Sequence, residues 1–241
     1  EAVVLSREEG HFPCEVVRTT FLGNLVEYEV ECPSTLLFQS WILVRRTNLV
    51  NNIFRCPWCG EDPLYVDYHD REWGVPLKDD RALFELLCLE GAQAGLSWIT
   101  VLKKREAYRR VFDRFDPGAV ARYDQRRIDE ILTDQGIIRN RLKVRSVVEN
   151  ARVFLDLQER EGSFSEYLWG FVDGKTIVNR WKSISQVPPE TDLSRRISMD
   201  MKKKGFRFVG PVIIYSLIQS AGLVNDHLVG CFRHDECSKM Q

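Results

Sequence analysis

The sequence predicts a mainly α-helical protein that is preceded by a small β-rich segment, and two patterns support this. From residue 54 onward, apolar residues return at the three- and four-residue spacing of helices, with Gly or Pro at the ends of many runs. Before that point, polar and apolar residues roughly alternate with a period of two, as they do in half-buried strands. We therefore expect a β-rich N-terminal appendage at 1–53 and a helical domain at 54–241.

The N-terminal appendage contains a hairpin signal. In CEVVRTTFLGNLVEYEVEC, β-branched and aromatic residues flank Gly23-Asn24, a pair that suits a tight turn, and LLFQSWILVRRT (36–47) offers a third strand. Through FLGNLVEYEV and VRRTN the segment resembles the small β-barrel module appended to the ATPase subunits of ABC importers. It contains no chemical motif. A fusion or a misread upstream segment is the alternative interpretation.

Capping residues and breakers place the helices of the second part. Asp79 or Asp80 can begin one helix, Ser97 a second and Pro117 a third. Further helices are expected over 124–136, 140–162, 163–172, 192–205 and 211–222, several of them ended by Gly. Between 174 and 189 the pattern fades and predicts a loop.

Composition excludes several classes of protein. The chain has 241 residues, 44% of them apolar, which is enough for a core. No apolar run approaches the roughly 18 residues of a membrane span, and the N-terminus lacks the features of a secretory signal. Seven thinly spread cysteines favour thiols and metal ligands over a disulfide framework. We expect a cytoplasmic protein without a membrane partner.

Positive charge is concentrated in the helical domain. Residues 1–53 carry four Lys and Arg against seven Asp and Glu, whereas the remainder carries 30 against 28. Three basic clusters stand out: Lys103, Lys104 and Arg105; Arg139, Arg141, Lys143 and Arg145; Lys202, Lys203, Lys204 and Arg207. One such cluster is usually a solvated helix face, but three in one domain favour a polyanionic partner.

Cysteine and histidine gather near both ends of the helical domain. Cys56 and His69 lie near its start, and His227 and Cys231 lie near its end. The spacing of four in NDHLVGC predicts that the last two side chains leave one helical face. Two Cys and two His form the closed tetrahedral set that a structural zinc prefers, and this set leaves no position for a catalytic water.

Spacing alone does not make this ligand set unique. Cys59 forms a CxxC pair with Cys56, and His234 and Cys237 are spare candidates. Taken alone, each histidine is more often a hydrogen-bonded polar residue than a ligand. A redox role for the CxxC is a weaker interpretation, because no βαβ pattern surrounds it.

The string KKKGFRFVGP (202–211) predicts an anion site. Glycines at both ends of the turn let backbone N–H groups converge, and the following helix adds its positive N-terminus. With lysines beside it, this turn resembles the hairpin of helix–hairpin–helix DNA-binding proteins, although an ordinary helix–turn–helix corner is the alternative. The candidate DNA-contacting residues here are Lys204, Gly205, Phe206, Arg207, Val209 and Gly210.

The run CLEGAQAGLSW contains a single acid, Glu90, between two helical patterns. A carboxylate in such an apolar run faces a cavity or a hydrogen-bond network, because burying it unpaired is costly. Five aromatic residues lie close to it in sequence: Trp58, Tyr65, Tyr68, Trp73 and Trp98. A helix cap and ordinary core aromatics are the simpler interpretation. A planar, electron-poor ligand that stacks on the rings and meets the acid is the alternative.

From about residue 55 to residue 231 the chain closely resembles the 3-methyladenine DNA glycosylase I family, the constitutive alkylation-repair glycosylases of bacteria. The strings that carry the resemblance are DPLYVDYHDREWGVP, LFELLCLEGAQAGLSWITVLKKREAYR, FDP, QGIIRNRLKVRSVVENA, KKKGFRFVGP and GLVNDHLVGC. The resemblance implies a helix–hairpin–helix glycosylase fold, with one structural zinc that joins the ends of the domain. The first 53 residues match nothing in this family.

The resemblance also assigns roles by position. Zinc ligands fall on Cys56, His69, His227 and Cys231. The base pocket falls on Trp58, Tyr68, Glu90 and Trp98, with Trp73 beside them. Gly95 and Leu96 are candidates to fill the gap that a flipped base leaves in the stack. The implied partner is double-stranded DNA containing methylated purines, and we expect a monomer.

The implied reaction is hydrolytic excision of a flipped, cationic 3-methyladenine in base excision repair, which leaves an abasic site. Glu90 would hydrogen-bond the base and favour its positive charge. Asn225 stands where related glycosylases carry an Asp that assists the attacking water. Pro211, Val212 and Ile213 follow the hairpin without a lysine, so no Schiff base and no strand cleavage are expected. A DNA-binding module without catalysis is the rival hypothesis.

Overall fold

The computed structural model describes residues 2–7, 10–22, 25–31 and 54–240. Contacts between Cα atoms divide the chain into two compact units, Glu1–Thr47 and Asn48–Gln241, and each is described by itself. No helix within the described ranges is long and apolar enough to cross a membrane.

The N-terminal unit is a three-stranded antiparallel sheet. Its strands β1 (Ala2–Arg7), β2 (Gly10–Leu22) and β3 (Leu25–Glu31) are adjacent in chain order. Leu22 pairs with Leu25, as the predicted hairpin requires, although Gly23 and Asn24 themselves lie outside the described residues. The strand expected over 36–47 also lies outside them, and β1 was not predicted.

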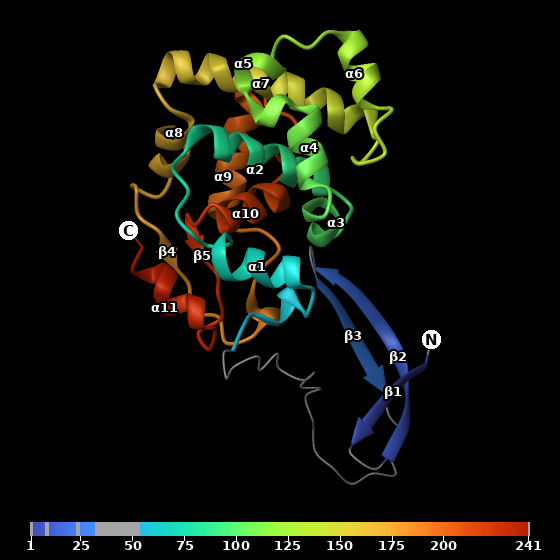
Figure 1. Cartoon of the computed structure of the whole chain (residues 1–241). Helices are drawn as coiled ribbons and strands as arrows, with labels where there is room; N and C mark the ends of the chain where they lie inside the picture. The colour runs from blue at the N-terminus through green and yellow to red at the C-terminus, as the bar shows by residue number, and fades with distance from the viewer. Residues whose placement is uncertain (1, 8–9, 23–24, 32–53, 241) are drawn as a thin grey trace. The chain divides into compact units, whose positions relative to one another are not determined.

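The second unit is mainly helical, as the sequence predicts (Figure 1). Its helices are α1 (Pro63–Arg71), α2 (Asp80–Gln93), α3 (Trp98–Leu102), α4 (Arg105–Val111), α5 (Pro117–Val120), α6 (Gln125–Ile131), α7 (Arg141–Glu161), α8 (Phe164–Gly170), α9 (Asp192–Lys204), α10 (Pro211–Ser220) and α11 (Phe232–Ser238). Short 3₁₀ turns cover Pro57–Cys59, Asp113–Phe115 and Ile184–Gln186. Two-residue strands β4 (Ile177–Val178) and β5 (Val224–Asn225) pair in parallel.

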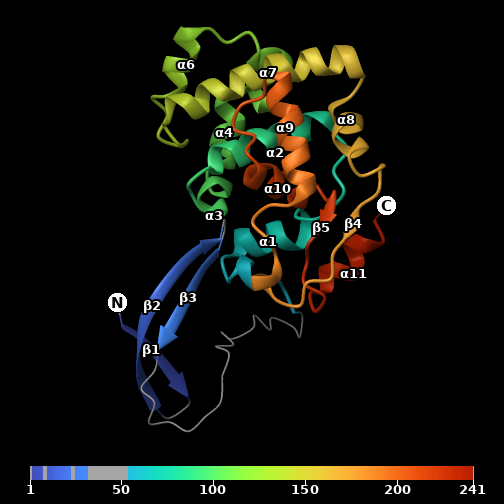
Figure 2. The ribbon, with the colours of Figure 1, turned by 180° about the vertical axis from the view of Figure 1, so that it is seen from behind.

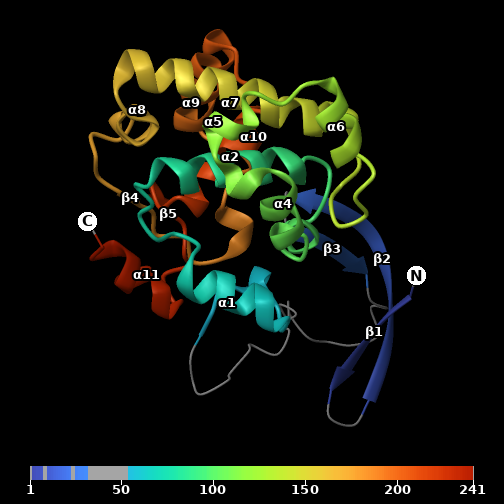
Figure 3. The same ribbon diagram turned by 45° about the horizontal axis from the view of Figure 1, so that its top comes forward.

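Helix α2 lies at the centre of this unit. It packs against α7, α8 and α10, and α10 packs in turn on α9. Figures 1, 2 and 3 agree that α2 and α10 lie between α7 on one side and α1 on the other. Phe84 of α2, Phe154 of α7 and Phe164 of α8 are fully buried and in ring contact. The last turn of α2, which contains Glu90, therefore lies inside the domain.

The structure corrects several expected boundaries. The helix expected from Ser97 to about residue 112 is divided into α3 and α4, and the helix expected over 124–136 ends at Ile131. Within the loop expected over 174–189, Ile177 and Val178 form a short strand because they reach an unpaired partner, β5. Helices α1 and α11 were not predicted, since both are short and begin after polar segments.

Candidate active site and metal centre

Four side chains from the two ends of the helical unit meet in one buried cluster. Cys56, His69 and His227 are fully buried, and Cys231 is 3% exposed. Their ligand atoms all lie within 4.8 Å of one another. Among the described residues, this is the group that can hold a metal ion.

The distances within the cluster fit a tetrahedral zinc. The sulfur of Cys231 lies 3.4 Å from Nε2 of His69 and 3.6 Å from Nδ1 of His227, and the sulfur of Cys56 lies 3.6 Å from the same Nδ1. Zn–S bonds of about 2.3 Å and Zn–N bonds of about 2.0–2.1 Å at tetrahedral angles separate sulfur from nitrogen by about 3.6 Å. These three sulfur–nitrogen distances therefore match those of a tetrahedral zinc site.

The nitrogen of each imidazole that faces away from the cluster is also held. Nδ1 of His69 lies 2.7 Å from Asp70, whose carboxylate is held by Arg55 at 2.7–2.9 Å. Nε2 of His227 lies 3.0 Å from the carbonyl oxygen of Trp73. Such outer contacts fix ring orientation and tautomer in metal sites. They leave Nε2 of His69 and Nδ1 of His227 directed at the cluster.

One premise of the metal prediction was wrong. His227 and Cys231 do not lie on one helical face: His227 follows β5, and Cys231 is the N-cap of α11. A turn brings the two residues together, with the Cys231 N–H donating to the Leu228 carbonyl at 2.7 Å. Residues 226–231, between the end of β5 and the start of α11, form no helix.

The alternative ligands have other roles. The Cys59 thiol donates to the Cys56 carbonyl oxygen at 3.1 Å, and burial raises its pKa to about 12, so it stays protonated. Nε2 of His234 lies 2.9 Å from the Asn179 carbonyl oxygen. Burial likewise raises the pKa of Cys237. None of the three joins the group of four.

The thiol of Cys231 is the one that ionises most readily. Its pKa is lowered because the Cys56 thiol donates to its sulfur and both imidazoles lie against it. A thiolate is the form that binds a metal ion. The cluster therefore has the donor chemistry of a metal centre as well as its geometry.

An aromatic cluster is built directly on the metal ligands. The Trp58 ring lies edge-on to His69 at 5.2 Å, and the Trp73 ring lies edge-on to His227 at 4.6 Å, both between centroids. Trp58 also contacts Tyr65 at 5.1 Å and Tyr68 at 6.4 Å. The imidazoles thus support the rings that the sequence places in the base pocket.

Glu90 lies in the last turn of α2 and is 2% exposed. Its Oε1 accepts a hydrogen bond from Ser220 at 3.0 Å, whereas its Oε2 is buried without a partner. Desolvation by burial raises the pKa of this carboxyl to about 8, and the Ser220 bond opposes the increase. The indole N–H of Trp98 is the second buried polar group here that lacks a partner. Buried polar atoms without partners are rare and point to a missing ligand or water.

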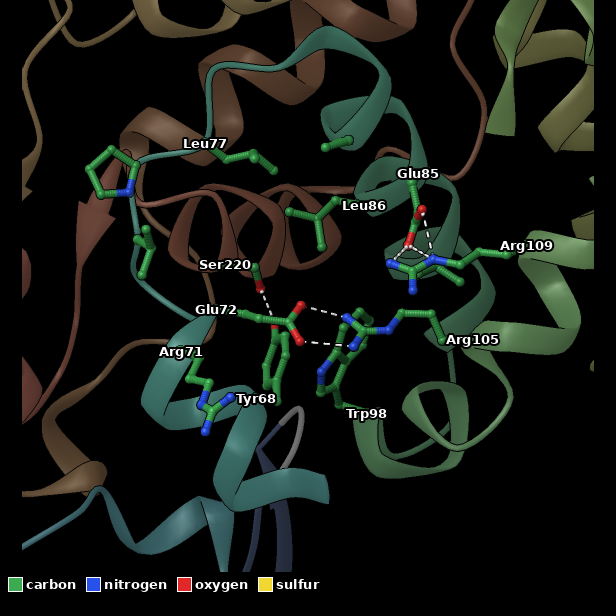
Figure 4. Close-up of a pocket in the computed structure, with 14 residues that line it drawn as sticks. Tyr68, Arg71, Glu72, Leu77, Glu85, Leu86, Trp98, Arg105, Arg109 and Ser220 are labelled. Carbon is green, nitrogen blue, oxygen red and sulfur yellow. Dashed lines mark hydrogen bonds and ion pairs between the residues drawn. The ribbon is translucent and has the colours of Figure 1, made fainter. Parts of the chain in front are cut away.

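Two of the predicted base-binding rings also line a cavity of about 260 Å³ (Figure 4). Tyr68, Trp98 and Ser220 form part of its wall, and apolar residues such as Leu86 complete it. Ion pairs between Glu72 and Arg105 and between Glu85 and Arg109 lie in the same wall. These charged groups are already paired, so the cavity offers ring surface rather than free charge.

Tyr68 and Trp98 cannot sandwich a base between themselves in this structure. Their ring centroids are 5.4 Å apart and their planes are tilted by 46°. A base stacked between two rings needs van der Waals separation on both sides, about 7 Å in total. A purine must therefore stack on a free face of one ring, or the rings must move.

The turn between α2 and α3 is exposed beside the buried Glu90. Gly95 has φ +77 with open space around its Cβ position, and Leu96 is 38% exposed. The side chain of Lys143 donates to the carbonyl oxygens of Ala92 and Ala94 at 2.8 and 2.6 Å. The C-terminal end of α2 is thus held by α7, which the sequence did not indicate.

A tight turn joins α9 and α10 within the string 202–211. Gly205 ends α9 with φ +104, and Gly210 is the N-cap of α10 without a side-chain partner. The side chains of Phe206 and Val209 are buried and support the turn from inside, so a contact of either residue with DNA is left to its backbone.

Two residues that the sequence analysis missed shape this turn. The side chain of Asn150 in α7 both accepts from the Arg207 N–H at 2.7 Å and donates to the Arg207 carbonyl at 3.0 Å. The Ser198 hydroxyl donates to the Val209 carbonyl at 2.6 Å. The tip also packs on α2, because a Cβ on Gly91 would lie 3.3 Å from the Cβ of Phe208.

Many of the predicted basic residues are paired within the protein. Lys103 pairs with Asp62, Arg105 with Glu72, Arg141 with Asp129, and Lys204 with Glu161. Arg207 lies 3.3 Å from Glu149 and is two-thirds exposed. Within the described ranges, Arg139, Lys202 and Lys203 form no ion pair. The basic surface is therefore smaller than the count of lysines and arginines suggests.

Asn225 does not face the aromatic cluster. Its amide donates to the His234 carbonyl and the Ser238 hydroxyl, and its oxygen accepts from the His227 N–H. The adjacent Asp226 accepts four hydrogen bonds, from Asn179, Trp181, Tyr215 and Gln219. Both side chains hold the C-terminal segment in place.

Comparisons with known proteins point to one family. The family model described as methyladenine glycosylase matches residues 58–234. DNA-3-methyladenine glycosylase 1 of Escherichia coli (strain K12) is 49% identical over 177 residues, which are 73% of this chain and 95% of that protein.

Solved structures give the same result. A crystal structure of 3-methyladenine DNA glycosylase I matches with a TM-score of 0.73 and 49% identity, covering 74% of this chain and 98% of the other. The Staphylococcus aureus enzyme, described in a structural account of 3-methyladenine recognition, matches with a TM-score of 0.72 and 40% identity over 74% and 95%. The resemblance found in the sequence is confirmed.

Proposed function

The chain belongs to the methyladenine glycosylase family, and on that premise we propose that it is a monofunctional DNA glycosylase for cationic 3-methyladenine. It binds double-stranded DNA that contains methylated purines and flips the damaged nucleotide out of the stack. It hydrolyses the glycosidic bond and leaves an abasic site for base excision repair.

The observation that carries this proposal is the unpartnered Oε2 of the buried Glu90. An adenine methylated at N3 is cationic, and its amino group donates hydrogen bonds. A buried carboxylate with a free oxygen matches both properties, because it supplies an acceptor and an opposite charge in a low-dielectric site. A neutral adenine gains less from the same carboxylate, which favours the alkylated base.

The aromatic rings supply the second part of recognition. Trp58, Tyr68 and Trp98 surround the site, with Trp73 behind them, and an aromatic face attracts a planar cation. Since Tyr68 and Trp98 are too close to sandwich a purine, the base stacks on one of these rings and displaces the other slightly. Catalysis is then chiefly recognition, because a cationic base is already a good leaving group.

The duplex is held by the turn between α9 and α10, which acts as the hairpin of a helix–hairpin–helix element. The backbone N–H groups near Gly210 and the N-terminal end of α10 bind a phosphate, and Lys204 and Arg207 add positive charge. Gly95 and Leu96 fill the gap that the flipped base leaves. The protein acts as a monomer, since one hairpin and one pocket complete the site.

The Cys56, His69, His227 and Cys231 cluster holds one structural zinc. When bound, the ion ties the N- and C-terminal segments of the domain together, and four protein ligands leave it no water to activate. The residues around it hold Trp58 and Trp73 at the pocket. Its effect on the reaction is therefore through the position of these rings.

Water attacks the sugar carbon as the base leaves, and no dedicated carboxylate activates this water. The Asn225 amide is fully engaged and cannot activate that water. This restricts the enzyme to labile, positively charged lesions. No lysine follows the hairpin in α10, so no Schiff base forms and the strand is not cleaved.

The test is release of free 3-methyladenine from methylated duplex DNA by the full chain, measured by chromatography. We expect 3-methyladenine as the product, abasic sites in equal amount and no strand breaks before alkaline treatment. Tight duplex binding without any released base would instead identify a DNA-binding module and overturn the proposal.

A further inference from the structure

Ser220 connects two residues of the proposed base pocket. It is the last residue of α10 and is 7% exposed. Its hydroxyl oxygen lies 3.0 Å from the hydroxyl of Tyr68 on α1 and 3.0 Å from Oε1 of Glu90 on α2. Three helices that are distant in sequence therefore meet at one serine side chain.

The direction of these two hydrogen bonds is fixed by chemistry. When Glu90 is ionised, its carboxylate can only accept, so the Ser220 hydroxyl then donates its single proton to Oε1 of Glu90. The lone pairs of Ser220 are then free to accept the proton of Tyr68. The Tyr68 bond thereby prevents the Ser220 hydroxyl from rotating away from the carboxylate.

The result is a carboxylate with two unequal oxygens. Oε1 is held by Ser220, and Oε2 is buried with no partner. Both oxygens are equivalent in a free carboxylate, so the asymmetry comes from the protein. A single accepted hydrogen bond also fixes the rotation of the carboxylate about its terminal bond, which is otherwise broad.

We propose that Ser220 is a positioning residue, which with Tyr68 holds Oε1 of Glu90 so that Oε2 is presented to the amino group of the cationic base. This inference rests on the proposed function and adds a residue to it. Ser220 does not touch the reacting atoms, so it acts through Glu90. Its sequence context, QSAG at the end of an apolar helix, gives no sign of such a role.

The surroundings of Glu90 make this one hydrogen bond important. From α1, the phenols of Tyr65 and Tyr68 interact with it electrostatically, and from α10 the Ser220 hydroxyl donates a hydrogen bond to it. No cation within the described ranges contributes to its pKa, which burial raises to about 8. Before the base binds, Ser220 is therefore the group that stabilises the ionised form of Glu90.

The experiment is a pH–rate profile for 3-methyladenine release by the full-length wild type and Ser220→Ala under single-turnover conditions. Excision needs the Glu90 carboxylate, so the rate rises with pH through its ionisation. Removing the Ser220 bond shifts this limb to higher pH by about one unit, which is about a tenfold loss on the rising limb. The difference shrinks at high pH, where both proteins are ionised.

Three variants separate positioning from simple packing. Ser220→Thr keeps a hydroxyl and should restore the wild-type limb. Ser216→Ala makes the same change one turn earlier on α10 and should leave the limb unmoved. In a Glu90→Gln background, Ser220→Ala should have little further effect, because its route to the substrate is already lost.

An unmoved limb in Ser220→Ala, or a loss that adds fully to that of Glu90→Gln, would overturn the inference while leaving the proposed function intact. A wild-type protein that releases no 3-methyladenine at any pH would overturn the proposed function instead.

Discussion

Two buried polar clusters lie in the same half of the helical domain, and they differ in whether their polar atoms have partners. In the Cys56–His69–His227–Cys231 cluster, the four ligand atoms face one another and both outward nitrogens are held. At Glu90, one carboxylate oxygen and the Trp98 indole N–H have no partner. The first cluster, called the closed cluster below, has the geometry to hold one metal ion. The second, formed by Glu90 and Trp98 and called the open cluster, has polar atoms left for a hydrogen-bonding ligand.

The two clusters are nevertheless connected by aromatic rings. Trp58 contacts His69 of the metal cluster and Tyr68 of the pocket, and Trp73 contacts His227. A change in the metal cluster must therefore move the pocket wall. A change at Glu90 need not disturb the metal cluster, and this asymmetry can be tested.

The largest effect is expected from breaking the closed cluster with Cys231→Ser. The serine cannot replace the thiolate that has the lowered pKa, so the zinc should be lost or weakly held. The two ends of the helical domain are then no longer joined. We expect a melting temperature lower by ten degrees or more, together with loss of excision, since Trp58 and Trp73 lose their support. Calorimetry and elemental analysis measure both.

Cys59→Ser is the matched control. Cys59 is also buried near the cluster, but its thiol donates to a carbonyl and stays protonated. It should retain one zinc per chain and most of its stability. Equal metal loss in both variants would mean that Cys59 belongs to the ligand set, and a fully stable, metal-free wild type would remove the zinc assignment.

At the open cluster, Glu90→Gln should separate activity from stability. We expect excision to fall by about a hundredfold, because the free oxygen and its charge are lost, while binding to abasic duplex changes little. Excision and duplex binding are measured separately, by base release and by titration. Equal losses in both measurements would show that Glu90 is a structural carboxylate.

Glu90→Gln should also make the folded protein more stable than the wild type at alkaline pH. Burial raises the Glu90 pKa from 4.5 to about 8, so the folded state holds its proton more tightly than the unfolded state. The wild type is therefore expected to lose stability, on the order of a few kcal/mol, as pH rises from about 4.5 to about 8. Glu90→Gln should lack this part of the decline, which denaturant unfolding at pH 5 and pH 9 would show.

The sequence could predict the closed cluster better than the open one. Cysteine and histidine are rare and chemically distinctive, so the four residues that meet in this cluster were identified even though the expected helix through His227 and Cys231 is a turn. Glu90 was identifiable as a lone acid in an apolar run. Ser220, which holds Glu90, and Asn150, which holds the turn between α9 and α10, were not identifiable, because a serine or asparagine inside a helix has no pattern that indicates its distant partner.

Charge was the least predictable property. Lys204, a candidate for DNA contact, also pairs with Glu161, and Lys143 donates hydrogen bonds to the carbonyl groups at the end of α2. Counts of basic residues do not show which of them are already neutralised by tertiary partners. Phe206, another candidate for DNA contact, has a buried side chain, and one turn of sequence cannot show which side chains point inward.

The smallest effect is expected at the rim of the open cluster, from Leu96→Ala. Leu96 is 38% exposed on the turn beside Glu90, so truncation should leave the melting temperature unchanged. If its side chain fills the gap left by the flipped base, truncation raises the cost of flipping, and excision from duplex DNA should fall by about three- to tenfold.

A single-stranded substrate sharpens this last test. Without a base stack there is no gap to fill, so Leu96→Ala and the wild type should excise 3-methyladenine from methylated single strands at the same rate. Leu64→Ala is the control, since Leu64 has the same 38% exposure but lies on α1. Equal losses on single and double strands would show that Leu96 contacts the lesion or shapes the pocket. Its role would then be base recognition rather than flipping.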